Sequence, residues 1–212
     1  MPLKISVNSF FILIALIFIA ACTPKMPQQT ATTNTPNTCL QQLKPNFQSV
    51  LYNTQVNVVG NHLSGLLLVK KMSADTTRIL FTSETGIKFF DFELTNNTFA
   101  IKYCIKKLNK KVVTTQLQKV FRLILMNYGN IDNYLEVEPD SLNNYRLENG
   151  KENVIYSTLK NCSELKHIET SSNKHKPKIS ITLDGAKNGI ADVIFIQYHT
   201  FSFDISLKQI DR

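Results

Sequence analysis

Four histidines are the side chains of this 212-residue chain best suited to bind a metal ion or to act as a general base. Such a site needs ligands that converge, for example two histidines four residues apart on one helix. No two of these histidines have helical metal-ligand spacing; they are His62, His167, His175 and His199. The chain also lacks a glycine-rich phosphate loop, a G-x-S-x-G elbow and an H-E-x-x-H motif. We therefore expect surface histidines, no catalytic residue, no metal, no cofactor and no enzymatic activity.

Six acidic residues between positions 132 and 152 raise the question of a calcium site. They are Asp132, Glu136, Glu138, Asp140, Glu148 and Glu152. Their spacing fits no calcium-binding loop. We interpret them as the solvated edge of a strand.

Residues 1–21 have the organisation of a secretory signal peptide. Lys4 provides the basic start, and Phe10–Ala21 is an unbroken run of twelve apolar residues. Because a helix needs about 20 residues to span the hydrocarbon core, this run is too short for a transmembrane helix. No later apolar stretch is long enough to span a bilayer.

The leader ends in Ile19-Ala20-Ala21-Cys22, which resembles the bacterial lipobox. This resemblance implies that Cys22 carries palmitate-type acyl chains, becomes the mature N-terminus and anchors the protein in the membrane. Each buried methylene adds about 0.8 kcal/mol, so the three chains implied would hold the protein firmly. Thr23, which stands where an Asp retains inner-membrane lipoproteins, implies the outer membrane by the same resemblance. By the same resemblance, residues 22–38 begin with the lipidated N-terminus. We expect the rest of them to form a flexible tether, because Thr, Pro, Gln and Asn dominate them.

Three cysteines remain when Cys22 is acylated: Cys39, Cys104 and Cys162. An oxidising compartment allows them one disulfide and one free thiol. The sequence leaves two alternatives open, a Cys39–Cys162 bond or no disulfide.

From about Cys39 onward, apolar residues recur at every second position, as in strands with one buried face. The clearest run is Val50, Tyr52, Thr54, Val56 and Val58. Further strands are predicted near 63–69, 78–83, 90–94, 99–103, 145–148, 153–157, 179–183, 193–196 and 201–207. Short turns such as Asn149-Gly150 separate neighbours, so the strands should form an antiparallel meander.

The segment Lys110–Met126 breaks the period of two. Its apolar residues share one helical face and are Val113, Leu117, Val120, Phe121 and Ile124. An amphipathic helix in a strand-rich chain must pack this face on the sheet. A shorter helix within Cys39–Phe47 stays open, since Pro45 interrupts it.

The formal net charge is +8, and the chain keeps +7 after residues 1–21, with Lys4, are removed. A secreted chain meets little nucleic acid, so we expect no nucleic-acid partner. Anionic headgroups or acidic glycans would suit this excess, and a surface tuned for solubility is the alternative. The basic clusters at 106–107, 110–111 and 174–178 are either a headgroup-facing patch or solvated surface.

The domain Cys39–Arg212 resembles the outer-membrane lipoprotein carrier and receptor family, LolA/LolB. The local likenesses are Ser64–Val69 and the strand pair and helix from Thr85 through Leu125. The resemblance implies a mainly β (α+β) fold: a single curved antiparallel sheet or half-barrel of about ten or eleven strands with one or two covering helices. It also implies that the concave side binds acyl chains.

Apolar residues in and near Phe81–Tyr103 are candidates for the lining of a lipid-sized cavity, and a packed core is the alternative. They are Phe81, Phe90, Phe92, Phe99 and Ile101. With a cavity, the protein would be a periplasm-facing, outer-membrane-anchored module that binds lipid or lipoprotein and acts in envelope or lipoprotein localisation. With a filled core, it would be a non-enzymatic structural subunit of an envelope assembly.

Replacement of Cys22 by Ala should release the protein from membranes, because no other segment of the sequence is expected to hold it there. Cell fractionation measures the release. Recovery of the Cys22→Ala protein in the fraction that requires detergent would reveal a second anchor.

Overall fold

The computed structural model of the chain describes residues 29–32, 38–58, 60–129, 135–137, 141–149, 152–174, 176–186 and 189–210. The predicted signal peptide, Cys22 and much of the tether lie outside the described residues. Among the helices of the described residues, none is long and apolar enough to cross a membrane.

The strands of the described residues, thirteen in number, form one antiparallel sheet in the order β1-β7-β8-β9-β10-β11-β12-β13-β2-β3-β4-β5-β6. The N-terminal strands are β1 (Gln29–Thr32), β2 (Ser49–Val58), β3 (Asn61–Lys71), β4 (Thr77–Thr82), β5 (Lys88–Leu94) and β6 (Phe99–Cys104). The C-terminal strands are β7 (Leu135–Val137), β8 (Asn143–Asn149), β9 (Glu152–Thr158), β10 (Leu165–Ser172), β11 (Pro177–Asp184), β12 (Val193–Tyr198) and β13 (Phe203–Gln209). The predicted single antiparallel sheet is confirmed.

Two meanders make up this sheet, and one strand pair joins them. Strands β2–β6 form the first meander and β7–β13 the second, while the helix α3 (Lys111–Ile124) connects the two. The last strand, β13, pairs with β2 in a regular register from Phe203↔Val58 to Gln209↔Tyr52. The sheet stays open, with β1 and β6 at its edges.

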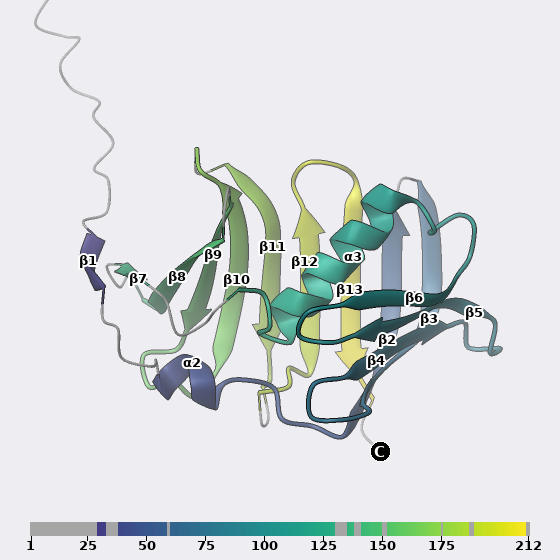
Figure 1. Cartoon of the computed structure of the whole chain (residues 1–212), viewed down its shortest axis with the longest axis horizontal. Helices are drawn as coiled ribbons and strands as arrows, with labels where there is room; N and C mark the ends of the chain where they lie inside the picture. Colours follow the sequence, from purple (N-terminus) through teal and green to yellow (C-terminus); the bar gives the residue numbers. More distant parts are fainter. Residues whose placement is uncertain are drawn as a thin grey trace, which may run out of the picture.

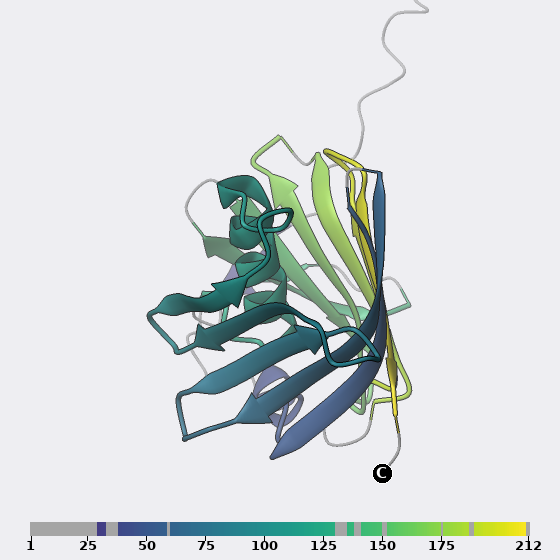
Figure 2. The same ribbon diagram turned by 90° about the vertical axis from the view of Figure 1, so that its right-hand side faces the viewer.

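The sheet curves strongly around α3, which lies diagonally across it (Figures 1 and 2). Alternate residues of the central strands are buried beneath the helix; β2, for example, alternates exposed and buried positions along most of its length. A long twisted sheet must curl or split, and one packed helix fills the hollow that curling creates. The predicted curvature and covering helix are confirmed.

Helix α3 forms where the apolar period changes from two to 3.6. Its buried face includes Val113, Leu117, Val120 and Phe121, and Ile124 is partly buried against the core. The helix begins after Lys110, which provides no side-chain cap. The predicted helix and its packing face are confirmed.

Three strands were not predicted. Strand β10 has the sequence LKHIETSS, in which only Leu165 and Ile168 are large apolar residues. Its polar residues Thr170 and Ser171 are nevertheless buried, so apolar alternation could not reveal the strand. The other two, β1 and β7, are short, and β1 lies within the predicted tether and pairs with β7.

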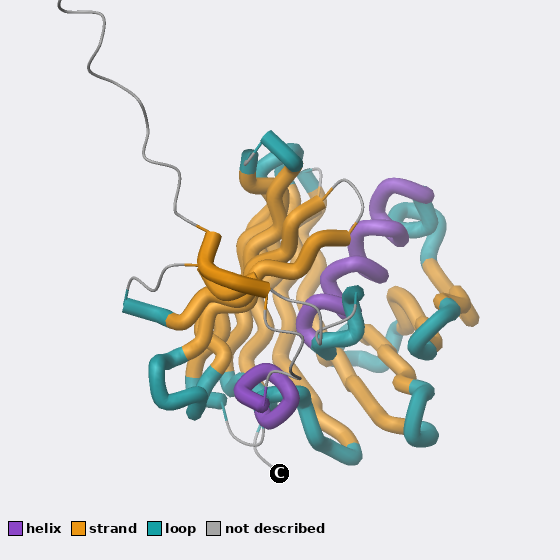
Figure 3. The backbone as a smooth tube through the Cα atoms, turned by 60° about the vertical axis from the view of Figure 1, so that its left-hand side comes forward, coloured by secondary structure: helices purple, strands orange, loops and turns teal. Residues whose placement is uncertain are grey.

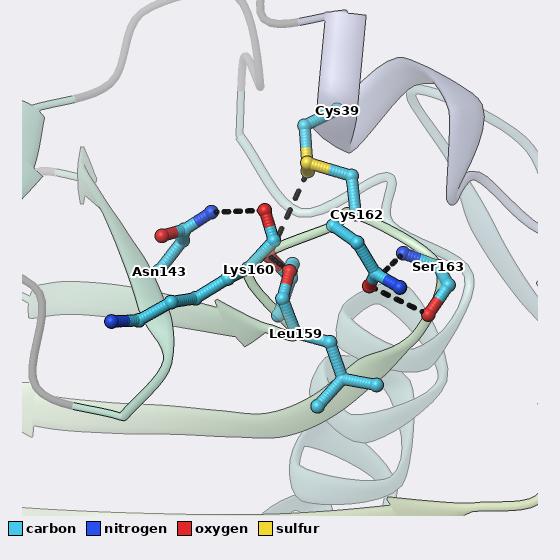
Figure 4. The surroundings of a disulfide bond; sticks show 8 residues. Cys39, Asn143, Leu159, Lys160, Cys162 and Ser163 are labelled. Carbon is cyan, nitrogen blue, oxygen red and sulfur yellow. Dashed lines mark hydrogen bonds between the residues drawn. A yellow bond between two sulfur atoms is a disulfide. The ribbon is translucent and has the colours of Figure 1, made fainter.

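A disulfide connects the short helix α2 (Thr38–Gln42) to the loop between β9 and β10. The Cys39 and Cys162 Cα atoms are 5.4 Å apart in this bond, and Figure 4 shows it beside Leu159 and Lys160. The neighbouring Leu40 is fully buried. Helix α2 is therefore fixed at one end of the strands, apart from α3 (Figure 3).

Replacement of Phe121 by Ala should lower the free energy of unfolding by about 3–5 kcal/mol. The ring is 5% exposed and packs edge-on against Phe90, with 6.1 Å between centroids. Urea unfolding measures the loss. The control Phe195→Ala, at a position 43% exposed on β12, should cost under about 1 kcal/mol. Similar losses for the two variants would contradict the packing of α3.

Candidate functional site

A small apolar cavity lies between the concave face of the sheet and α3. Its volume is about 20 Å³, close to the least space that one water molecule needs. All but one of its lining residues are apolar; the exception is Thr54. The apolar lining residues are Val56, Leu67, Phe81, Phe90, Leu108, Val113, Leu117, Phe121, Ile196, Phe203, Ile205 and Leu207. A space with so few polar partners favours an apolar occupant.

Two of the five predicted lining residues, Phe81 and Phe90, lie in this cavity. Their ring centroids are 5.4 Å apart. Phe92 stacks on Phe90 at 4.3 Å and is fully buried, so it belongs to the packed core beside the cavity. Within this aromatic cluster, Phe81 and Phe90 therefore line the cavity, and Phe92 packs in the core beside it.

The predictions for Phe92, Phe99 and Ile101 need correction, because none of these residues is part of the lining described for this cavity. Phe99 is half-buried and contacts the Phe92 ring at 5.0 Å. Ile101 pairs with Phe92 across the strands but is 42% exposed. For Phe99 and Ile101, the physical reason is the position of β6, which is an edge strand of the sheet that the described residues form.

The opposite wall of the cavity comes from β12 and β13, which the sequence did not connect to this site. Phe203 lies in this wall and stacks on Tyr198 at 4.6 Å. The alternation of Phe203, Ile205 and Leu207 predicted a strand with one buried face. Only the long-range pairing of β13 with β2 places that face in the cavity.

From its middle onward, α3 is hydrogen-bonded to the sheet. The Tyr198 hydroxyl donates to the Gln116 carbonyl at 3.0 Å, and the Tyr156 hydroxyl donates to the Leu123 carbonyl at 3.4 Å. The Arg122 guanidinium donates to two carbonyls of the β5–β6 turn at 2.9 and 3.0 Å. These contacts fix the later turns of the helix.

The β6–α3 segment, Lys106–Thr115, has no such contacts within the described residues. Apart from the helical hydrogen bonds of α3 itself, its hydrogen bonds stay inside the segment or reach Ile105. The Ile105 N–H in turn donates to the Phe89 carbonyl at 2.9 Å. Burial of Leu108 and Val113, together with Thr114, holds the segment to the core. The covering of the cavity is therefore weakest at the start of α3.

Glu152 accepts hydrogen bonds from two lysines and a tyrosine beside α3. The Lys119 ammonium donates to one carboxylate oxygen at 2.5 Å, and Lys178 donates to the other at 2.6 Å. The Tyr128 hydroxyl also donates to this carboxylate, at 3.1 Å. Burial acts to raise the pKa of Glu152, but the two lysines outweigh burial and hold the pKa below its ordinary value. An ionised Glu152 thus ties α3 to β9 and β11.

Of the other residues considered from the sequence, Asp132, Glu138, Asp140 and His175 lie outside the described residues. Within the described part of the chain, no group of three or more His, Cys, Asp or Glu side chains could hold a metal ion. His62 and His199 contact Asn57 and Ser180, respectively, on the surface. Burial raises the pKa of the Cys104 thiol to about 11, which makes it a poor nucleophile at neutral pH.

The fold is similar to that of solved structures, at very low sequence identity. A LolA superfamily protein from Nitrosomonas europaea has a TM-score of 0.54 and 8% identity, over 84% of this chain and 92% of that chain. An outer membrane lipoprotein-sorting protein domain from Vibrio parahaemolyticus has a TM-score of 0.50 and 8% identity, over 82% of this chain and 89% of that chain. No protein-family model and no curated protein matches the sequence. At this identity the likeness establishes the fold.

Replacement of Glu152 by Gln should lower the free energy of unfolding by about 1–3 kcal/mol at pH 7, because Lys119 loses its charged partner at a site 11% exposed. The folded-state pKa of Glu152 is depressed, so its stabilisation is present above about pH 4.3 and lost as the pH falls through the folded-state value. The difference between wild type and variant should therefore shrink below about pH 4.

Urea unfolding at several pH values measures this difference. The control is Asp184→Asn, which breaks the exposed contact with Lys166 and should change stability little at any pH. A Glu152→Gln variant that matches this control at pH 7 would show that the network does not hold α3.

Proposed function

We propose that this protein is an outer-membrane-anchored periplasmic lipoprotein whose β domain binds an acyl chain, carried by a lipid or by another lipoprotein, and acts in envelope or lipoprotein localisation. The leader and the lipobox-like Ile19–Cys22 support the anchor. The likeness in fold to a LolA superfamily protein and to a lipoprotein-sorting domain supports the binding role.

The observation that carries the proposal is the apolar cavity beneath α3. Residues of β2–β5, β12, β13 and the β6–α3 segment, together with the middle of α3, enclose it, and all of them except Thr54 are apolar. Its volume of about 20 Å³ is far too small for an acyl chain, so under this proposal the structure is a closed state. Binding requires part of the cover to move.

The β6–α3 segment is the part that can move at least cost. Within the described residues, its displacement breaks no hydrogen bond between the segment and the sheet. The later turns of α3, in contrast, are bound to the sheet through Tyr198, Arg122 and Glu152. The movement exposes Leu108 and Val113. An entering acyl chain offsets that exposure at roughly 25 cal/mol per Å² of apolar area that it buries.

A fluorescent fatty acid tests the proposal with the delipidated, unacylated Cys22→Ala chain, which should bind it saturably. Leu117→Ala enlarges the cavity beneath α3 and should increase the affinity several-fold. Leu147→Ala is the matched control, because Leu147 is buried to a similar degree, 2% against 3% exposed, and is not part of the described lining. Both variants should lose about 2–5 kcal/mol of stability, but only Leu117→Ala should change binding.

A structural subunit without a ligand is the second candidate, and one observation favours it. Val193 and Phe195 on β12 are 42% and 43% exposed, on the face opposite to the buried Ile194 and Ile196. This outward apolar pair would suit a protein contact. Absence of saturable fatty-acid binding by well-folded protein, in wild type and in Leu117→Ala alike, would reject the acyl-binding proposal and leave this alternative.

A further inference from the structure

The 35 residues from Thr95 to Gly129 contain seven basic residues and no acidic one. Three of the seven have partners in the fold. Lys102 pairs with Glu93 at 3.0 Å, Lys119 pairs with Glu152, and Arg122 donates to carbonyls of the β5–β6 turn. Each of these three basic side chains therefore has a partner within the domain.

The other four basic residues lie on the β6–α3 segment and are Lys106, Lys107, Lys110 and Lys111. All four are exposed. Within the described residues, no ion pair involves any of them. Four unneutralised charges within six residues repel one another, so the folded domain gains nothing from their concentration here.

Two of these lysines lie at the end of a helix where positive charge is unfavourable. Lys110 is the N-cap of α3 and Lys111 is its first residue, and the first turn contains no acidic side chain. The N-terminus of a helix carries a partial positive charge, so lysines there cost some helix stability, and an anion beside them would reverse the effect. The same turn lacks a side-chain cap.

Apolar side chains are exposed beside these charges. Val112 is 65% exposed, and Tyr103, near the end of β6, is 46% exposed. Lys88 lies over the Tyr103 ring, 5.7 Å from its centroid. Exposed apolar groups interleaved with lysines are typical of surfaces that enter the headgroup layer of a bilayer.

The carboxylates of β5, the strand paired with β6, do not cancel the charge of this surface. Asp91 is paired with Arg78 and Lys88, and Glu93 is paired with Arg78 and Lys102. These groups therefore leave the charge of the β6–α3 segment unchanged.

We propose that the β6–α3 segment docks on a bilayer of anionic lipid, with Lys106, Lys107, Lys110 and Lys111 on the headgroups and Val112 among them. A bilayer fits these observations better than an acidic protein does, because the lysines are flexible point charges without the fixed forks of arginine and surround an exposed valine. The proposal does not depend on acyl binding. It places the start of α3, where the cover of the cavity is weakest, against the membrane.

Vesicle co-sedimentation of the unacylated Cys22→Ala chain tests the proposal. Vesicles of phosphatidylcholine with about 30% phosphatidylglycerol should bind the protein at low ionic strength, and pure phosphatidylcholine should not. Each lysine near an anionic surface strengthens binding about fivefold. The fourfold variant Lys106→Gln, Lys107→Gln, Lys110→Gln, Lys111→Gln should therefore bind at least 100-fold more weakly, by order of magnitude.

A second fourfold variant removes the same charge elsewhere: Lys44→Gln, Lys160→Gln, Lys176→Gln, Lys208→Gln. These lysines are also exposed. It should bind within about tenfold of the parent protein, since distant charges are screened. An equal loss in both variants would show that net charge alone attracts the protein, and no binding to the anionic vesicles would direct attention to an acidic protein partner; either result overturns the proposal.

The absence of Trp from the chain permits a site-specific reporter. Val112→Trp should show a blue-shifted emission and quenching by brominated lipid when anionic vesicles are added. Met72→Trp, at a position 56% exposed on another part of the surface, should show neither. A shift at Met72 without one at Val112 would mean that the protein docks through a different face.

Discussion

The pairing of β13 with β2 is the constraint on which the rest of the molecule depends. It joins the last strand of the chain to the first strand of the N-terminal meander, in seven successive residue pairs without a bulge. Without it, two separate meanders would each expose an unpaired edge and an apolar face. With it, one sheet becomes long enough to curl, and its two central strands place Val56 beside Ile205 in the wall of the cavity.

This long-range closure shapes how the domain can assemble. Within each meander, neighbouring strands are also neighbours in sequence, and such local contacts form quickly; the β13–β2 contact closes a loop of about 150 residues and must form later. The Cys39–Cys162 bond spans 123 residues and restricts the unfolded chain between α2 and the β9–β10 loop. It holds α2 next to this loop, with Leu40 buried behind it.

The sequence predicts those elements in which buried apolar residues recur at a regular spacing. Strand β2 alternates almost perfectly, and the spacing of Leu117, Val120 and Phe121 indicates a helix. Strand β10 was missed because Thr170 and Ser171 replace apolar residues in the core, and polar residues carry no such period. Two of the five predicted lining residues, Phe81 and Phe90, line the cavity. Ile101 has the same alternation, but it lies on an edge strand and is exposed. The pairing of β13 with β2 brings Phe203 to the cavity. This pairing joins residues far apart in the chain, so no local sequence pattern could predict it.

The uneven attachment of α3 connects the closed cavity to the charged surface. A helix that served only to fill the core would be expected to gain from caps and partners along its whole length, and its later turns have them in Tyr198, Arg122 and Glu152. Its start instead has two lysines against the helix dipole, no cap, and a valine in solvent. These features lower the stability of the same short segment whose Leu108 and Val113 cover the cavity. Weak attachment and exposed charge thus coincide in one segment, as expected if a negatively charged surface outside the domain and an apolar ligand inside it both act on the first turn of α3.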